Sequence, residues 1–235
     1  MRIFQESANL YRLTRFGMIN CFLVREDDGF TLVDTGVAGS APGILAAAHS
    51  LGQPIRRILL THGHIDHVGS LDALRVAIPE AQLIAGTRES RLLAGDLALD
   101  RRETGKTLRG FIRVHTLPDR TLNEGDCVAS LQAVSSPGHT PGHMAFLDSR
   151  DGALLAGDAF TTQMGLVAAG VLKFYFPFPR IFSWNSFLAA ESALKLSRLK
   201  PTSLSVGHGN TLESPLLAME NAARLALRQC GKVLD

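Results

Sequence analysis

The chain has 235 residues, of which 46% are hydrophobic, and its formal net charge is +2. That length supports a sizeable hydrophobic core, so we expect one domain over residues 1–235. The basic residues are scattered, which argues against a nucleic-acid-binding surface, and no apolar run approaches the ~18 residues of a membrane span.

The first half of the chain predicts strands, then alternating helices and strands. Strands are expected at residues 9–15, 19–25 and 29–34, the last two joined by a hairpin turn at 26–29. Ser40 is the expected N-cap of a helix that extends to about Leu51. Next we expect a strand at 56–60, a helix from Val68 to Ile78, a strand at 81–85 and a helical stretch from about residue 87.

The second half predicts short strands and two long helices. The strands are expected at residues 129–134, 144–148, 153–157 and 203–206. Ser183 is the expected N-cap of a helix to Leu199, and Ser214 that of a closing helix to about Gln229. This mixture of strands and helices favours an α/β layered fold.

The segment Thr61-His62-Gly63-His64-Ile65-Asp66-His67 carries four metal-ligand side chains within six positions, directly after a predicted strand. Imidazole and carboxylate groups bind zinc and other divalent first-row metals. On an extended chain His62 and His64 project to the same side, and a helix start after Gly63 lets Asp66 and His67 turn toward them. The alternative is a histidine-rich surface loop. We predict a metal site, because other segments supply further ligands.

Three later segments carry those further ligand types. They are Ser136-Pro137-Gly138-His139-Thr140-Pro141-Gly142-His143, Leu154-Leu155-Ala156-Gly157-Asp158 and Val206-Gly207-His208-Gly209. Each follows an apolar run or is enclosed by glycine and proline, as expected of side chains presented at a strand end. Of the six histidines in these segments we take five as candidate ligands, and with two aspartates they exceed the ligands that one metal needs, so the count favours two metals.

In order and approximate separation, these motifs resemble the metal-binding motifs of the metallo-β-lactamase-fold hydrolases. Asp34, in Leu32-Val33-Asp34-Thr35-Gly36, is similar to the earliest motif of that family. The resemblance extends from about residue 20 to residue 210. It implies a four-layer αβ/βα sandwich of two mixed β-sheets flanked by helices.

The resemblance also implies a role for each ligand. One metal would be bound by His62, His64 and His139, and a second by Asp66, His67 and His208, with Asp158 bridging the two. Asp34 would be a buried residue that holds a ligand loop by hydrogen bonds. His143 is expected to be a supporting residue, and His49 and His115 surface or boundary residues. Zinc is the expected metal, with iron or manganese as alternatives.

Such a centre predicts hydrolysis. Two metals about 3.5–4 Å apart can share a water and lower its pKa toward ~7, which provides a bridging hydroxide as nucleophile. Asp66 would be the catalytic residue that carries a proton to the leaving group. We therefore expect a hydrolase that cleaves an ester, lactone, thioester or related bond of a small molecule.

Two other functions stay open. A mononuclear iron persulfide dioxygenase on the same fold would use His62, His139 and Asp158 as its ligand triad. A binding or regulatory protein would keep the metal without turnover. Departures from known family members argue against two enzyme classes, the acyl-homoserine lactonases and the glyoxalase II proteins. Asp158 is followed by Ala-Phe-Thr, without the tyrosine typical of acyl-homoserine lactonases. The chain also ends about 27 residues after His208, where glyoxalase II proteins add a helical segment.

Residues 172–187 concentrate aromatic side chains in a chain that is only 6% aromatic. This segment is expected to contact an apolar part of the substrate, with Lys173 or Arg180 as an anion contact. The alternative is a loop packed on the core or a contact between two copies in a homodimer.

The compartment is predicted from the cysteines and the amino terminus. Cys21, Cys127 and Cys230 are far apart and odd in number, so we expect free, core or partly buried thiols in a reducing compartment. The first residues lack the apolar region of a secretory signal. Both observations favour the cytoplasm.

Overall fold

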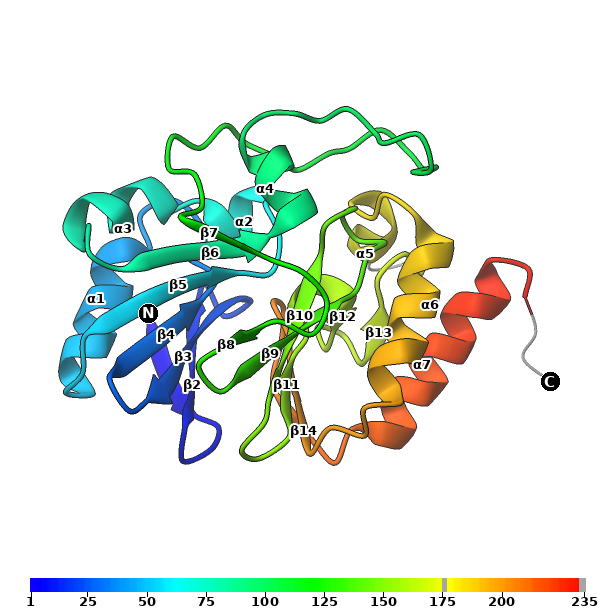
Figure 1. Cartoon of the computed structure of the whole chain (residues 1–235). Coiled ribbons are helices and arrows are strands. Elements are labelled where there is room, and N and C mark those ends of the chain that lie inside the picture. Colours follow the sequence, from blue (N-terminus) through cyan, green and yellow to red (C-terminus); the bar gives the residue numbers. More distant parts are fainter. Residues whose placement is uncertain (175–176, 233–235) are drawn as a thin grey trace. The chain divides into compact units, whose positions relative to one another are not determined.

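The computed structural model describes residues 1–174 and 177–232 (Figure 1). The chain divides into two compact units, Met1–Asp96 with Gly110–Leu122 and Leu97–Arg109 with Asn123–Asp235. Each unit holds a large mixed β-sheet with helices packed on it. The predicted α/β fold with two mixed sheets flanked by helices is therefore confirmed. The assignment of residues 1–235 to one domain stays a prediction.

The first unit contains a seven-stranded sheet in the order β1 to β7. Its strands are β1 (Arg2–Gln5), β2 (Leu10–Arg15), β3 (Ile19–Glu26), β4 (Gly29–Val33), β5 (Ile55–Leu60), β6 (Gln82–Gly86) and β7 (Arg120–Leu122). Its helices are α1 (Ala41–Ser50), α2 (Ile65–Val68), α3 (Leu71–Ala77) and α4 (Thr87–Leu93). Apolar residues of α1 and α3, including Ile44 and Leu74, pack with Leu32 and Ile58 of the strands in one core.

The strand directions of this sheet determine where its loops meet. Strands β1 to β4 are antiparallel and are joined by short turns, whereas β4 to β7 are parallel. The carboxyl ends of adjacent parallel strands lie at the same sheet edge. Asp34 follows β4, Thr61 follows β5, and α4 follows β6. Three polar segments are thus brought to one edge.

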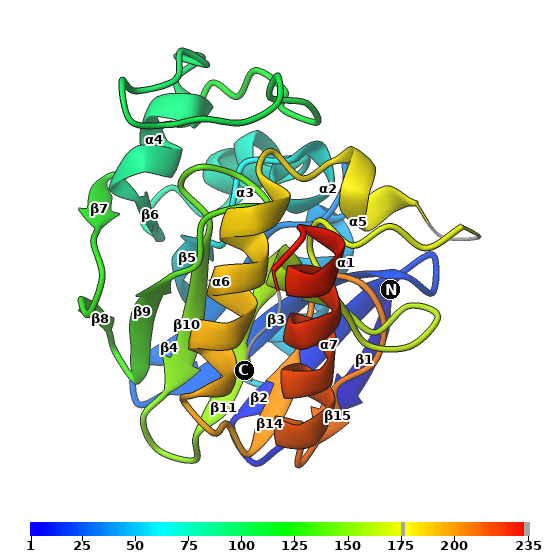
Figure 2. The ribbon, with the colours of Figure 1, turned by 90° about the vertical axis from the view of Figure 1, so that its right-hand side faces the viewer.

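The second unit contains a six-stranded sheet in the order β15, β14, β11, β10, β9, β8. The strands are β8 (Cys127–Val128), β9 (Leu131–Ser135), β10 (Met144–Asp148), β11 (Ala153–Leu155), β14 (Ser203–Ser205) and β15 (Leu212–Glu213), and β12 (Phe160–Thr161) pairs separately with β13 (Val167–Ala168). The helices are a 3-10 turn (Gly157–Ala159), α5 (Phe178–Ile181), α6 (Ser186–Ser197) and α7 (Leu216–Gln229). Figure 2 shows α6 and α7 side by side. Their contact uses small buried residues such as Ala193 and Ala223.

The helix expected from Val68 to Ile78 is α3, Leu71–Ala77, and a separate short helix, α2, ends at Val68. Gly69 separates α2 from α3, and a Cβ atom there would lie 2.5 Å from the backbone N of Ala38 and from the backbone O of Ile65. Ser70 also makes hydrogen bonds to the segment 37–40: its Oγ donates to Val37 O and accepts from the N–H of Ser40. The close approach therefore requires glycine and ends α2 after one turn. The shortest strands and α5 carry no periodicity that a sequence pattern can detect.

The three predicted serine N-caps do not cap. Ser40 stands at the N-cap position of α1, but its Oγ accepts from Arg15 and makes no cap bond. Helix α7 begins after Pro215 without a side-chain cap, so Ser214 does not cap it. Helix α6 begins at Ser186, and its cap is Asn185, whose side chain accepts from the N–H groups of Phe187 and Leu188. Ser183 lies before the helix and has another role, described below.

Replacing Asn185 with alanine should lower the free energy of unfolding by about 1–2 kcal/mol, because two N–H groups at the start of α6 lose their acceptor. The Asn185 Nδ2 group also donates to Thr104 O at 2.6 Å. Asn185→Asp keeps the cap acceptor and loses only that second bond, so it should be destabilised less. Urea unfolding followed by circular dichroism measures both variants. Equal stability of Asn185→Ala and the parent chain would contradict the capping role.

The burial of the three cysteines agrees only in part with the prediction. None of the three cysteines, all of which are among the described residues, forms a disulfide bond, but Cys127 is exposed, so the prediction of a core or partly buried thiol was wrong there. Among residues 1–174 and 177–232, the structure contains no helix with the length and apolar character needed to cross a membrane.

Candidate metal centre

The first unit brings the three histidines of the 61–67 segment together. His62 and His67 are fully buried, and their ring centroids are 4.0 Å apart. The His64 ring lies 4.7 Å from that of His62 and 4.9 Å from that of Phe111. Asp66 is only partly buried, in the first turn of α2. The loop therefore presents clustered ring nitrogens next to a carboxylate that solvent can reach.

Asp34 holds this loop by three hydrogen bonds. Its Oδ1 accepts from the Thr61 N–H at 2.8 Å, and its Oδ2 accepts from Thr61 Oγ1 at 2.8 Å and from His67 Nδ1 at 2.7 Å. A carboxylate at Nδ1 places the ring proton there and makes Nε2 the nitrogen with which His67 could bind a metal. Asp34 is thus the buried supporting residue that the sequence predicted, in a left-handed backbone conformation with φ +61°.

Glu89 is a second supporting residue of this loop, which sequence reasoning missed. Its Oε1 accepts from the Gly63 N–H at 2.7 Å, and the side chain is fully buried in the first turn of α4. Gly63 fits closely, because a Cβ atom there would lie 3.1 Å from Phe111. A single glutamate at the start of a helix gives no sequence signal for this role, since the contact joins residues 26 positions apart.

Cys21 does not compete as a metal ligand in this unit. Burial raises the pKa of its thiol far above the usual range, and the negative charge of Asp34 raises it further. A protonated thiol is a poor ligand, because metals bind the thiolate.

The second unit brings together His139, Asp158 and His208. Asp158 Oδ2 lies 3.4 Å from His139 Nε2 and 3.2 Å from His208 Nε2. The strand register explains the pairing of Asp158 with His208. Strands β11 and β14 are parallel with Leu155 opposite Ser205, and each candidate ligand follows three residues later. Both side chains therefore emerge at one edge of the sheet.

Ser183 orients His139. The Ser183 hydroxyl donates to Pro179 O at 2.5 Å, so its oxygen can accept from His139 Nδ1 at 3.3 Å. This bond turns Nε2 of the ring toward Asp158. The backbone is fixed as well, because the Trp184 N–H donates to His139 O at 3.0 Å. Gly138 has φ +132°, and a Cβ atom there would lie 2.1 Å from the Ala189 backbone N.

His143 supports Asp158. The Asp158 N–H donates to His143 Nε2 at 3.1 Å, and His143 Nδ1 lies 2.8 Å from Ser136 Oγ. The two contacts are satisfied by a neutral ring with its proton on Nδ1. The expected supporting role of His143 agrees with this geometry. His49 and His115 are exposed, as expected of surface residues.

The aromatic segment 172–187 divides into buried and exposed parts. Trp184 is buried, and Phe187 packs against the core of the second unit. Phe174, Phe178 and Phe182 are exposed, while residues 175 and 176 lie outside the described residues. Core packing thus accounts for part of the segment, and its contact with substrate stays a prediction.

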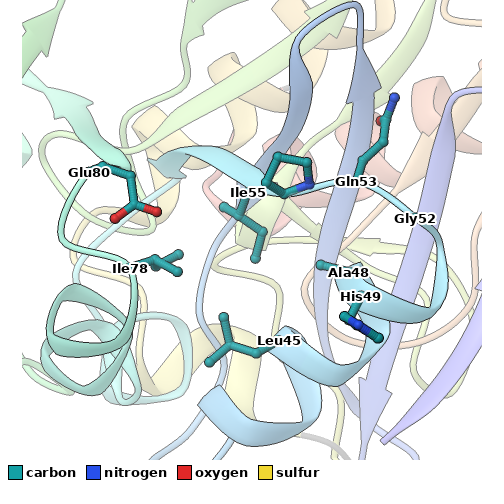
Figure 3. A pocket seen from close by; sticks show the side chains of 9 residues that line it. Leu45, Ala48, His49, Gly52, Gln53, Ile55, Ile78 and Glu80 are labelled. Atoms are coloured by element: carbon teal, nitrogen blue, oxygen red, sulfur yellow. The ribbon is translucent and has the colours of Figure 1, made fainter.

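The first unit also contains a pocket of about 420 Å³ that is separate from these ligands. Figure 3 shows Leu45 and His49 of α1 around it, together with Ile55, Ile78 and Glu80. Ile55 begins β5, whereas the 61–67 loop follows the other end of that strand. The whole length of β5 therefore lies between this pocket and the histidine loop.

The donor groups of each unit fit a divalent metal. The first unit offers three imidazoles and Asp66, and the second offers two imidazoles and Asp158, all from the ligand classes that zinc, iron and manganese accept. In each unit a buried hydrogen bond orients at least one of these donors, as in known metal sites.

Comparisons with known proteins agree with the sequence motifs. The profile of the metallo-beta-lactamase superfamily matches residues 14–208. The uncharacterized protein YobT of Bacillus subtilis is 43% identical over 96% of this chain and 99% of its own length. The probable metallo-hydrolase YybB of the same organism is 28% identical over 83% of this chain and 82% of its own.

Two further comparisons concern activity and metal. A hydroxyacylglutathione hydrolase of Rhodospirillum rubrum is 37% identical over 55% of this chain and 44% of its own length. The solved structure of TTHA1623 in a di-iron-bound form has a TM-score of 0.63 and 27% identity, and covers 87% of this chain and 94% of that one. With the superfamily profile matched over most of its length, the chain belongs to the metallo-beta-lactamase superfamily.

Proposed function

We propose that this chain is a metal-dependent hydrolase with a binuclear centre, which cleaves an ester, lactone, thioester or related bond of a small molecule. The hydrolase class follows from the superfamily and from its metallo-hydrolase and hydroxyacylglutathione hydrolase relatives. The observation that carries the proposal is the buried support given to the ligand residues within each unit, by Asp34 in the first and by Ser183 and His143 in the second.

The proposed ligand sets are those that the motifs imply. His62, His64 and His139 would bind one metal, Asp66, His67 and His208 the other, and Asp158 both. Zinc is the proposed metal, with iron or manganese as the alternatives. The di-iron form of TTHA1623 supports a centre with two metals in a protein of this fold. The supporting bonds of His67 and His139 both occupy Nδ1, so Nε2 is the nitrogen of each ring that would bind the metal.

The chain's own residues would then organise the reaction. Two bound metals supply an activated water as nucleophile and an electrophile for the carbonyl oxygen. Asp66 is the group that moves the proton, because its carboxylate is partly exposed at the start of α2 while the neighbouring histidines are buried. Asp34 and Glu89 keep the 61–67 loop in one conformation. His143 fixes the backbone of Asp158.

Metal removal tests the proposal. Purified protein should contain about two metal ions per chain. It should hydrolyse members of a panel of esters, lactones and thioesters, lose this activity with a chelator and regain it with zinc. One iron per chain together with oxygen consumption on a persulfide would instead establish the dioxygenase alternative. Two bound metals without turnover of any panel member would favour the non-catalytic metal-binding protein.

A further inference from the structure

Three basic side chains gather in the second unit. They are Lys106 and Arg109, from the segment Leu97–Arg109, and Arg180 of α5. The Lys106 ammonium donates to Arg180 O at 3.2 Å, so the two side chains belong to one small region. Within residues 1–174 and 177–232, none of the three forms an ion pair with a carboxylate.

The positive charges of the neighbouring arginines disfavour the protonated form of Lys106. The Lys106 side chain is exposed, yet its limited burial lowers the pKa of the ammonium, and the charges of Arg180 and Arg109 lower it further. Like charges held together repel one another, and a bound anion removes that repulsion. The arrangement is therefore typical of an anion-binding site.

The cluster is held in place by the backbone. The Lys106 N–H donates to Trp184 O at 2.9 Å, and Asn185 Nδ2 donates to Thr104 O. Between these bonds Gly105 lies against the Trp184 indole, where a Cβ atom would approach Nε1 to 2.3 Å. Segment 104–106 is thus fixed on residues 184–185.

The same residues hold the candidate ligand His139. Ser183 and Trp184 bond the ring and the backbone of His139, and Ser183 in turn donates to Pro179 O. Arg180 is the next residue after Pro179 in α5. Residues 179–185 therefore contain Arg180, fix the backbone of Lys106, and support the candidate ligand His139.

Phe178 and Phe182 lie two positions before and after Arg180, so in helix α5 they share a face that the Arg180 side chain does not. The rings of Phe178 and Phe182 stack with centroids 6.4 Å apart and planes 15° apart. They remain 55% and 38% exposed, respectively. The anion contact proposed for Arg180 therefore does not depend on these rings.

We propose that Lys106, Arg109 and Arg180 bind an anionic group of the substrate, a carboxylate or a phosphate, so that the enzyme selects acyl substrates that carry a negative charge. This inference rests on the proposed hydrolase function. Arginine and lysine side chains bind both anions through charge-assisted hydrogen bonds. Lys173, the other basic residue of the 172–187 segment that the sequence suggested as an anion contact, donates to Met164 O and serves as the matched control.

The first test compares two esters of equal chain length, neutral 4-nitrophenyl valerate and anionic mono-4-nitrophenyl glutarate. In Lys106→Gln and Arg180→Gln, kcat/KM for the glutarate ester should fall about ten-fold or more, because a charge-assisted contact is lost. The value for the valerate ester should not change. Lys173→Gln should behave as the parent chain for both esters. An equal loss for both esters, or a selective loss only in Lys173→Gln, would overturn the assignment.

The second test measures binding without turnover. Trp184 is the only tryptophan of the chain, and it contacts the 104–106 segment, so its fluorescence reports on this site. Titrations of the purified protein with glutarate and with inorganic phosphate identify the preferred anion, and valeramide is the neutral control. Affinity should fall about ten-fold in Lys106→Gln and Arg180→Gln but not in Lys173→Gln.

The two tests separate this inference from the proposed function. Selective anion binding without hydrolysis of any ester would support the site and contradict the hydrolase. Metal-dependent hydrolysis with unchanged ester preference and unchanged anion affinity in Lys106→Gln and Arg180→Gln would support the hydrolase and contradict the site.

Discussion

Asp158→Ala should abolish hydrolysis and reduce the metal content from two ions per chain to one or none. Asp158 Oδ2 lies within 3.4 Å of ring nitrogens of both His139 and His208, so its carboxylate contacts two candidate ligands of this unit. Its loss removes a ligand and the negative charge that offsets the metal charge. We expect kcat to fall at least about 10³-fold, which corresponds to ~4 kcal/mol of activation free energy.

Metal analysis by inductively coupled plasma mass spectrometry, together with kinetics on a panel substrate, measures this effect. Glu191→Gln is the matched control, because it removes an exposed carboxylate from α6 of the same unit. That variant should keep both metals and full activity. An Asp158→Ala protein with two metals and parent activity would rule out the bridging role.

The sequence pattern points to the candidate ligand segments because of the way strands present residues, and the binding of metal by these residues stays a prediction. Each motif follows a strand of apolar residues, so the pattern of an apolar run followed by a polar loop is local in the chain. The roles of Asp34 and His143 also carried over from the motifs, and the structure gives both the expected hydrogen bonds. Which ligands share a metal stays a prediction.

The residues that sequence reasoning missed act through contacts between distant positions. Glu89 bonds Gly63, and Ser183 bonds His139 across 44 positions. Serine is a residue type favoured at N-caps, but Ser183 is not the cap. Asn185 is closer to the first turn of α6, and its side chain accepts hydrogen bonds from two N–H groups there. Ser183 is buried instead against the His139 ring. A short polar residue before a helix satisfies either role, and only the tertiary contact decides between them.

Asp34→Asn should weaken metal binding at the His67 position by about 10- to 100-fold, the usual cost of losing the partner that orients a ligand. In the parent chain the carboxylate accepts all three of its hydrogen bonds, from the Thr61 N–H, the Thr61 hydroxyl and His67 Nδ1. An asparagine whose oxygen accepts from the Thr61 N–H must present its NH₂ group to His67. His67 Nδ1 then becomes an acceptor, and the ring proton moves to Nε2, where it blocks metal binding. The opposite amide orientation places two donors, NH₂ and the Thr61 N–H, against each other.

This substitution isolates the carboxylate from the backbone, because asparagine tolerates the left-handed conformation that Asp34 adopts at φ +61°. Zinc titration with a competing chelator should show one weakened metal, and urea unfolding should show a loss of about 1–3 kcal/mol from the unsatisfied buried groups. Asp28→Asn is the matched control in the same unit: it breaks only an exposed ion pair with Arg57, a contact of little expected energy. Metal affinity equal to that of the parent chain in Asp34→Asn would mean that the tautomer of His67 is not set by Asp34, and the 2.7 Å contact would then be a packing contact without a role in the metal centre.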